Sequence, residues 1–210
     1  PLNTADTIVY SEGNTHGSMP SPGYRTAIST IGITTGKWYW EAKVTFHANG
    51  DQQYGIAHSD TPESELEALI GNSAKAYTYQ ATNGNKYNNS SGASYGDSWS
   101  TTGDIVGVAF DATNGTIWFS KNGTWQNSAT ATEIANGTTT NAAYSGLSTT
   151  VIWLPVFCLG NTNQTDVNFG SPPYANTSDA ADGNGYGAFE YAPPSGYLAL
   201  CTKNLGSDGG

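Results

Sequence analysis

The sequence predicts an all-β protein, an antiparallel sandwich of two β-sheets with one short inserted helix. Short segments rich in Val, Ile, Thr, Tyr, Phe and Trp recur between clusters of Gly, Asn and Ser, as strands recur between turns. Helical periodicity is nearly absent. The 210 residues are enough to bury a full core in one sandwich without disulfide bonds. We therefore expect a single domain over residues 1–205 and a linker-like tail at 206–210.

The predicted strands follow one another along most of the chain. In residues 36–46, Trp38 and Trp40 alternate with Tyr39 and Glu41, as expected of a strand with one buried face. Residues 103–125 predict a three-stranded meander, because two Asn-Gly pairs within them tolerate the positive φ that hairpin turns need. Further strands are predicted at residues 8–11, 24–31, 53–57, 76–80, 151–159, 166–169 and 198–202.

One segment, residues 61–71, has the signals of a short helix. Thr61 is placed to cap it, Pro62 occupies the first helical position, and Gly71 closes it. These signals predict a two-turn helix inserted beside the sheets. Polar segments at 83–100, 126–149 and 170–187 are predicted to be long loops, and loops of that length in a compact domain are usually functional or poorly ordered.

Charged residues are scarce and mostly acidic. They make up 11% of the chain, with 7 basic and 17 acidic residues and a formal net charge of -10. Such a chain has no basic patch to displace counterions from a phosphate backbone, which argues against nucleic acid and, for the same reason, against anionic membranes. No apolar segment approaches the ~20 residues of a membrane-spanning helix. We expect neither a nucleic-acid partner nor membrane insertion.

The cysteines and the chain ends carry two further expectations. Cys158 and Cys201 both lie in apolar segments, so we predict buried free thiols, with a disulfide between them as the alternative. The chain begins at Pro1 and ends in a Gly-rich segment. We expect it to be a domain of a longer polypeptide.

Several patterns associated with catalysis or metal binding occur without the context that they require. Residues 92–96 fit G-x-S-x-G around Ser94, but no helix is predicted after them and all three histidines precede them. Glycosidases need paired carboxylates, whereas Glu41 stands alone in its strand. The Asp-rich loop at 179–184 leaves calcium open, although its spacing differs from that of a helical calcium loop. We therefore predict no catalytic residues, no zinc and no required cofactor.

Aromatic residues are the strongest candidates for ligand binding. Those in predicted strands are expected in the core: Trp38, Trp40, Phe110, Trp118, Phe119 and Phe157. Others lie in or beside polar loops, where a half-buried ring with a wet polar tip suits recognition of proteins or sugars. The alternative is that these rings pin the long loops to the sandwich. The candidate ligand-binding residues are Tyr87, Tyr95, Trp99, Trp125, Tyr144, Tyr174 and Tyr186.

Five motifs in order resemble those of the SPRY domain, a concanavalin A-like β-sandwich. They are Gly-Lys-Trp-Tyr-Trp-Glu at 36–41, Tyr-Gly-Ile-Ala at 54–57, Gly-Asp-Ile-Val-Gly-Val-Ala-Phe-Asp at 103–111, the hairpin at 114–123 and Leu-Pro-Val-Phe at 154–157. The C-terminal segments at 168–170 and 189–202 are similar to SPRY-like modules of bacteriophage tail and fibre proteins.

The resemblance implies a non-enzymatic recognition module that binds through loops at one edge of the sandwich. We expect it on a viral or phage surface or tail fibre, and hence in an extracellular setting, where it binds a glycan or protein of the host envelope. One alternative is a structural assembly domain that packs against other virion or filament subunits and is oligomeric through its parent chain. A third alternative is a glycan-degrading enzyme.

Overall fold

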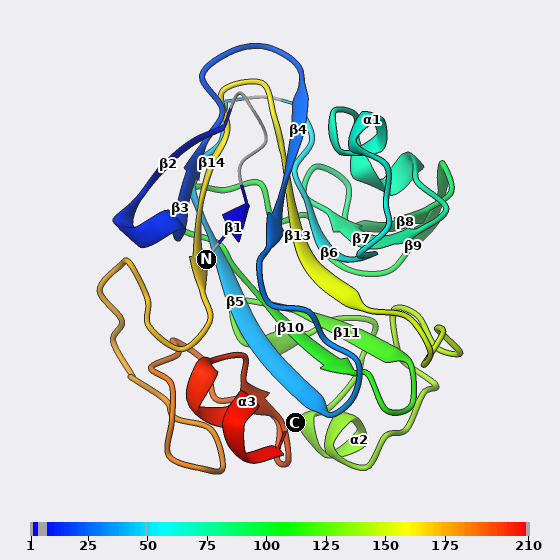
Figure 1. Cartoon of the computed structure of the whole chain (residues 1–210), viewed down its shortest axis with the longest axis vertical. Coiled ribbons are helices and arrows are strands. Elements are labelled where there is room, and N and C mark those ends of the chain that lie inside the picture. Colours follow the sequence, from blue (N-terminus) through cyan, green and yellow to red (C-terminus); the bar gives the residue numbers. More distant parts are fainter. Residues whose placement is uncertain (1, 4–7, 49, 209–210) are drawn as a thin grey trace. The chain divides into compact units, whose positions relative to one another are not determined.

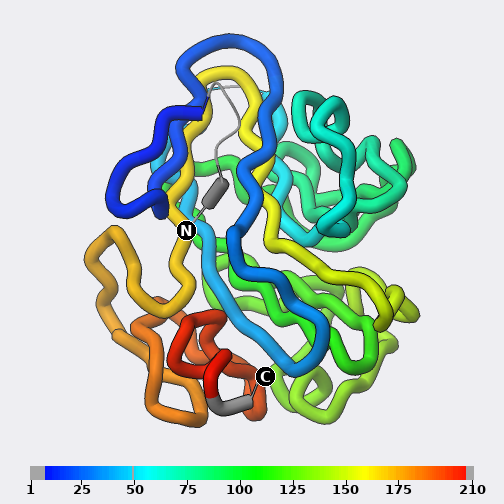
Figure 2. Tube along the Cα trace, in the orientation of Figure 1, coloured from blue at the N-terminus to red at the C-terminus, as the bar shows by residue number. Residues whose placement is uncertain are grey.

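The computed structural model describes residues 2–3, 8–48 and 50–208, and strands dominate it (Figure 1). Its internal contacts divide the chain into two compact units. Unit 1 comprises Pro1–Gly32, Lys43–Asp104 and Val151–Asp166, and unit 2 comprises Ile33–Ala42, Ile105–Thr150 and Val167–Gly210. The chain therefore contributes three separate segments to each unit, and Figure 2 traces it from the N-terminus to the C-terminus by colour.

Unit 1 contains an antiparallel sheet with the strand order β1-β4-β13-β6-β7-β8-β9. Its register places Tyr54 opposite both Phe157 and Tyr79. The Trp99 ring lies 4.4 Å from that of Tyr54, so aromatic packing forms the centre of the unit. The strands are β1 (Leu2–Asn3), β4 (Tyr24–Ser29), β13 (Trp153–Gly160), β6 (Gln53–His58), β7 (Ala76–Gln80), β8 (Asn85–Asn88) and β9 (Ser91–Ser94).

A second sheet has the strand order β12-β11-β10-β5-β14-β3-β2. The predicted meander is confirmed, since β10 pairs with β11 and β11 with β12 in antiparallel register. The strands are β2 (Val9–Ser11), β3 (His16–Ser18), β5 (Lys37–Phe46), β10 (Ile105–Asp111), β11 (Thr116–Lys121), β12 (Thr124–Trp125) and β14 (Gln164–Asn168). A further strand, β15 (Leu198–Ala199), runs parallel to β5.

The prediction that β5 buries one face is wrong, because Trp38, Tyr39, Trp40 and Glu41 are all at most 2% exposed. Within unit 2, the C-terminal residues supply the missing cover. Phe189 packs edge-on against Tyr39 at a ring distance of 4.9 Å. The alternation of polar and apolar residues could not reveal this layer, which comes from 150 residues further along the chain.

The predicted two-turn helix is also wrong, since α1 (Glu63–Leu66) is a single turn followed by a 3₁₀ turn, η2 (Ile70–Asn72). Pro62 is extended, with ψ at 144°, and lies at the cap rather than inside the helix. The Thr61 hydroxyl does not cap the helix but donates to the carbonyl of His58 at 2.7 Å.

The expectation of one inserted helix is corrected by two more helices. α2 (Ala131–Ala135) lies within the predicted 126–149 loop and begins with a capping box between Thr130 and Glu133. α3 (Thr202–Asp208) covers the start of the predicted linker-like tail. The predicted 83–100 loop contains the β8–β9 hairpin, and another 3₁₀ turn, η1 (Glu12–Asn14), follows β2.

Both cysteines are free thiols, as predicted, although Cys201 is half-exposed while Cys158 is buried. Burial raises the pKa of the Cys158 thiol to about 11, so it is protonated at neutral pH. None of the helices in the described part of the chain is long and apolar enough to cross a lipid bilayer.

Candidate functional site

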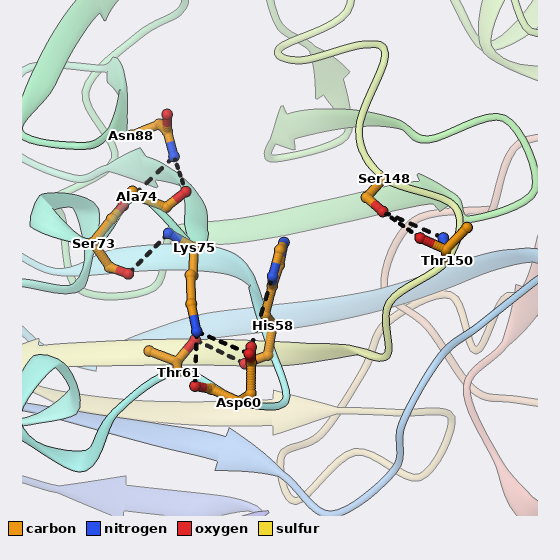
Figure 3. Close-up of polar contacts among 9 residues, drawn as sticks. All are labelled: His58, Asp60, Thr61, Ser73, Ala74, Lys75, Asn88, Ser148 and Thr150. Carbon is orange, nitrogen blue, oxygen red and sulfur yellow. Dashed lines mark hydrogen bonds and ion pairs between the residues drawn. The ribbon is translucent and has the colours of Figure 1, made fainter.

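The ends of β6 and β7 in unit 1 bring three ionisable side chains together, as Figure 3 shows: His58, Asp60 and Lys75. Backbone hydrogen bonds hold the chain on both sides of these side chains. The His58 backbone N–H donates to the Lys75 carbonyl at 3.0 Å, and the Thr61 N–H donates to the His58 carbonyl at 3.1 Å. These bonds hold the backbone that carries the three side chains.

Asp60 is the centre of the charged group. Its Oδ2 lies 2.9 Å from Lys75 Nζ, and its Oδ1 lies 3.8 Å from His58 Nδ1. A hydrogen bond from Lys75 holds the pKa of Asp60 below its usual range. Burial of the imidazole lowers the pKa of His58, although Asp60 opposes this effect. At neutral pH the group therefore presents one anion, one cation and a neutral imidazole.

The backbone of one exposed apolar residue is bonded to the residue between His58 and Asp60. Ile152 is 46% exposed, and its carbonyl accepts the N–H of Ser59 at 2.9 Å. A Cβ at Gly32 would lie 2.7 Å from Ile152 Cγ2, so glycine at that position leaves room for the side chain. We call Ile152 together with the His58, Asp60 and Lys75 group, to which it is joined through the backbone of Ser59, the Ile152 surface. Asp60 and Ile152 are exposed, and His58 and Lys75 are half-buried.

Aromatic packing supports the His58 imidazole. The His58 ring meets the buried Trp153 ring edge-on at 4.4 Å, and Tyr77 meets the same indole at 5.7 Å. Register explains these contacts, because Trp153 on β13 lies directly opposite His58 on β6. The imidazole is thus held in one orientation by a rigid indole.

Hydrogen bonds from β8 fix the segment that carries Lys75 (Figure 3). The Asn88 side-chain amide donates to the carbonyls of Ala76 at 2.8 Å and Ala74 at 3.1 Å. The Lys75 N–H donates to the Ser73 hydroxyl at 3.0 Å. Figure 3 also draws a separate contact in unit 2, where the Ser148 and Thr150 hydroxyl groups lie 3.1 Å apart.

The side-chain partner of the His58 ring is Asp60, whose Oδ1 lies 3.8 Å from His58 Nδ1. Across the residues that the structure describes, no group of three or more His, Cys, Asp and Glu side chains is placed to hold a metal ion.

Three predicted aromatic candidates lie in unit 1. Trp99 and Tyr95 are 0% and 5% exposed, and both rings pack against Tyr79, so they pin the 83–100 segment to the sheet. Tyr87 is half-buried on β8, and its hydroxyl accepts from the Asn83 amide at 3.1 Å. The structure does not bring these rings together on one exposed face.

The other four candidates lie in unit 2. Trp125 packs edge-on to Tyr39, and Tyr144 forms a β-bridge with Ile117. The Tyr174 hydroxyl donates to buried Glu41 at 3.3 Å. Tyr186 has an exposed ring with Lys203 Nζ 5.1 Å from its centroid. The ligand-binding role of all seven residues stays a prediction.

In the 179–184 loop, the candidate for calcium binding, the Asp182 carboxylate accepts hydrogen bonds from the protein itself. Asp182 accepts from the N–H groups of Ala199, Tyr186 and Asn184 and from the Asn204 side chain, at 2.7 to 2.9 Å. Burial raises the pKa of Asp182, but these donors outweigh it and hold the pKa below its usual value. The carboxylate therefore ties the loop to β15 and α3.

Sequence reasoning missed the Ile152 surface. Ile152 falls in a predicted strand, where an isoleucine is expected to be buried, and the sequence offers His58 only as a candidate catalytic base or zinc ligand. Asp60 and Lys75 are 15 residues apart, and no periodic signal joins them. The pairing of β6 with both β7 and β13 is what brings the residues together.

Comparison with known proteins places this chain in a family. The family model of the SPRY domain matches residues 37–172. The dual specificity protein kinase splA of Dictyostelium discoideum is 31% identical over 109 residues, which are 51% of this chain and 4% of that protein. The Set1 complex component ash2 of Schizosaccharomyces pombe is 31% identical over 86 residues, 41% of this chain and 13% of that protein.

A solved structure shares the fold. The SPRY domain of human HERC1 superposes with a TM-score of 0.60 at 16% identity, covering 80% of this chain and 96% of that one. This likeness confirms the predicted antiparallel sandwich. Because the family model spans more than half of the sequence, this chain belongs to the SPRY domain family.

Proposed function

We propose that this chain is a non-enzymatic module that binds a segment of a partner protein through the Ile152 surface. SPRY domains are typically protein–protein interaction modules. The observation that carries the proposal is the 46% exposed Ile152, whose carbonyl is bonded to Ser59, the residue before Asp60 of the Asp60–Lys75 ion pair. Protein interfaces combine an apolar centre with polar groups at the rim, and this surface offers both.

The rigidity of the Ile152 surface supports a binding role. The backbone bonds between His58 and Lys75, and those from Asn88, leave little loop ordering to be completed on binding. Ile152 supplies apolar area that a partner can cover. Lys75 and Asp60 add directional contacts, which favour one partner orientation over another.

A displayed library of random linear peptides tests the proposal. Peptides selected on the wild-type chain are measured against Ile152→Asp, with Val9→Asp as the matched control, because Val9 is an apolar side chain of unit 1 that is 57% exposed. We expect Ile152→Asp to weaken binding at least tenfold, about 1.4 kcal/mol, and Val9→Asp to leave it unchanged. Selected peptides that bind both variants equally would contradict the proposed site.

The expected setting on a viral or phage surface, with a host glycan or protein as ligand, stays a prediction. The sequence that flanks this domain in its parent polypeptide tests this prediction. A fibre-forming segment next to the domain would favour a role on a viral or phage surface. The assembly alternative predicts self-association, which sedimentation of the chain over a range of concentrations measures. A glycan-degrading role is disfavoured by Glu41, whose carboxylate is fully buried and accepts five hydrogen bonds from the protein.

A further inference from the structure

Unit 2 contains a cavity of about 370 Å³ between the 170–187 loop and α3, which lie beside each other in Figure 1. Three chain segments line it, at 170–171, 185–188 and 201–203. All but the first lie beyond residue 172, where the match to the SPRY family model ends. Most of the cavity lining therefore comes from a part of this chain that the family pattern does not describe.

Two glycines shape the cavity wall. Gly170 and Gly187 have φ values of +114° and +90°, a region that other residues rarely adopt. A Cβ at Gly187 would lie 2.7 Å from the Phe189 ring, and one at Gly170 would lie 3.3 Å from the Cα of Gly187. Side chains at either position would be strained and would crowd the wall.

A buried carboxylate holds the wall segments in place. Asp182 accepts the backbone N–H of Tyr186 at 2.9 Å on one side and the side-chain amide of Asn204, in α3, at 2.7 Å on the other. Asn204 also donates to the carbonyl of Ala199 at 2.9 Å. Through these bonds the loop that carries Tyr186 and the helix that carries Lys203 are fixed to the same residue.

The lining combines a cation, an aromatic ring and hydroxyl groups. Lys203 Nζ lies 5.1 Å from the centroid of the Tyr186 ring, which is 37% exposed. Ser171 and Thr202 also line the cavity. An aromatic face packs against the C–H groups of a sugar ring, and an ammonium group pairs with a carboxylate.

Charge and volume narrow the class of ligand. One ammonium group matches one carboxylate, whereas the formal net charge of -10 opposes the approach of multiply charged phosphates. The volume lies at the lower end of the roughly 300–1,000 Å³ typical of small-molecule sites. This size suits a ligand of one or a few sugar units.

We propose that this cavity binds an acidic sugar, with Lys203 pairing with the carboxylate, Tyr186 packing against the ring, and Ser171 and Thr202 bonding its hydroxyls. The acidic sugar can be free or can form the end of a glycan chain. This site lies in unit 2 and shares no residue with the Ile152 surface, so either proposal can fail without the other.

Titration of the whole chain with glucuronate, followed by NMR chemical shifts, tests the proposal. Glucose lacks the carboxylate, acetate lacks the ring, and inorganic phosphate tests for a general anion site. We expect saturable binding of glucuronate that is at least tenfold tighter than that of the other three probes. A glucuronate-terminated oligosaccharide distinguishes the sources, since a glycan-end site binds it at least as tightly as the free sugar.

Variants test the assigned contacts. Lys203→Gln and Tyr186→Leu are each expected to weaken glucuronate binding at least tenfold, while the control Lys121→Gln, in β11 of the same unit, leaves it unchanged. Thermal unfolding verifies that each variant is folded. If Lys203→Gln does not fold, the glucuronate affinity of Tyr186→Leu tests the proposal instead. Absence of saturable binding, equal binding of glucose, acetate or phosphate, or equal loss in Lys121→Gln would each overturn the proposal.

Discussion

Replacement of Glu41 by glutamine tests how unit 2 holds its C-terminal segment on β5. The Glu41 carboxylate is fully buried. Its Oε1 accepts the Tyr191 N–H at 2.8 Å and the Tyr39 hydroxyl at 3.1 Å. Its Oε2 accepts the Glu190 N–H at 3.0 Å, with Tyr174 and Asn168 at 3.3 and 3.4 Å.

Glutamine has the same shape but turns one acceptor into a donor. The amide is best placed with its NH₂ at the Oε1 position, because the Tyr39 hydroxyl can rotate to accept while the Tyr191 N–H cannot. One buried backbone donor then loses its partner, which costs about 1–3 kcal/mol. We expect the low end of this range, since glutamine avoids the cost of burying a charge. Glu41→Ala leaves both backbone donors unpaired, and its cost is about twice as large.

Urea unfolding measures the effect as a shift in midpoint at constant slope. The control is Glu63→Gln, which makes the same change at an exposed site in α1 and is expected to stay within about 0.5 kcal/mol of the wild type. If Glu41→Gln unfolds at the wild-type midpoint, the carboxylate does not hold the C-terminal segment and the reasoning is refuted.

The pH dependence of the same variant is a separate check. Burial raises the pKa of Glu41 in the folded chain, against the lowering effect of its hydrogen bonds. A folded pKa above the unfolded one gives stability that is present below the unfolded value of 4.5 and is lost as pH rises through the folded pKa. The free energy of unfolding of the wild type relative to Glu41→Gln should therefore fall as pH rises through this window. A difference that is constant with pH would show that the carboxyl group is unperturbed.

Three further predictions concern other parts of the chain. Trp99→Ala removes a fully buried ring from the Tyr54 cluster and should lower the free energy of unfolding in urea by about 3–5 kcal/mol, and a loss below 1 kcal/mol would contradict the packing. Thr130→Ala removes the capping box of α2 and should cost about 0.5–2 kcal/mol in the same assay, whereas Thr130→Ser should restore most of it. A thiol reagent should label Cys201 in the native chain but reach Cys158 only on unfolding, because Cys158 is buried and its pKa is raised to about 11; equal labelling rates would argue against this.

The strands were predicted well where the turns between them contain an Asn-Gly pair. The Asn-Gly pairs at 114–115 and 122–123 place the β10–β11–β12 meander, and β7 has the predicted bounds of Ala76–Gln80. The β8–β9 hairpin turns at Asn89 and Ser90, both with positive φ, and this pair is a weaker turn signal than Asn-Gly. The Thr130 and Glu133 spacing is a capping-box signal that could have identified α2.

The candidate site was less predictable than the fold. Exposure of Ile152 depends on what covers the end of β13, and this is not encoded in the residues around it. The same holds for Trp99 and Tyr95, which lie in a polar segment yet fill the core of unit 1. Burial of a single side chain follows from long-range packing, whereas periodicity reports only on the local strand.

The sequence by itself determined the all-β class, the order of most strands, the hairpin turns and the family, because these follow from residue types a few positions apart. Tertiary structure alone decided that both faces of β5 are buried, that Glu41 holds the C-terminal segment, that Asp60 pairs with Lys75, and that Ile152 is bonded to the neighbouring Ser59. The physical reason is that strand pairing joins residues far apart in the chain. Packing across those pairs then sets which side chains remain exposed to a partner.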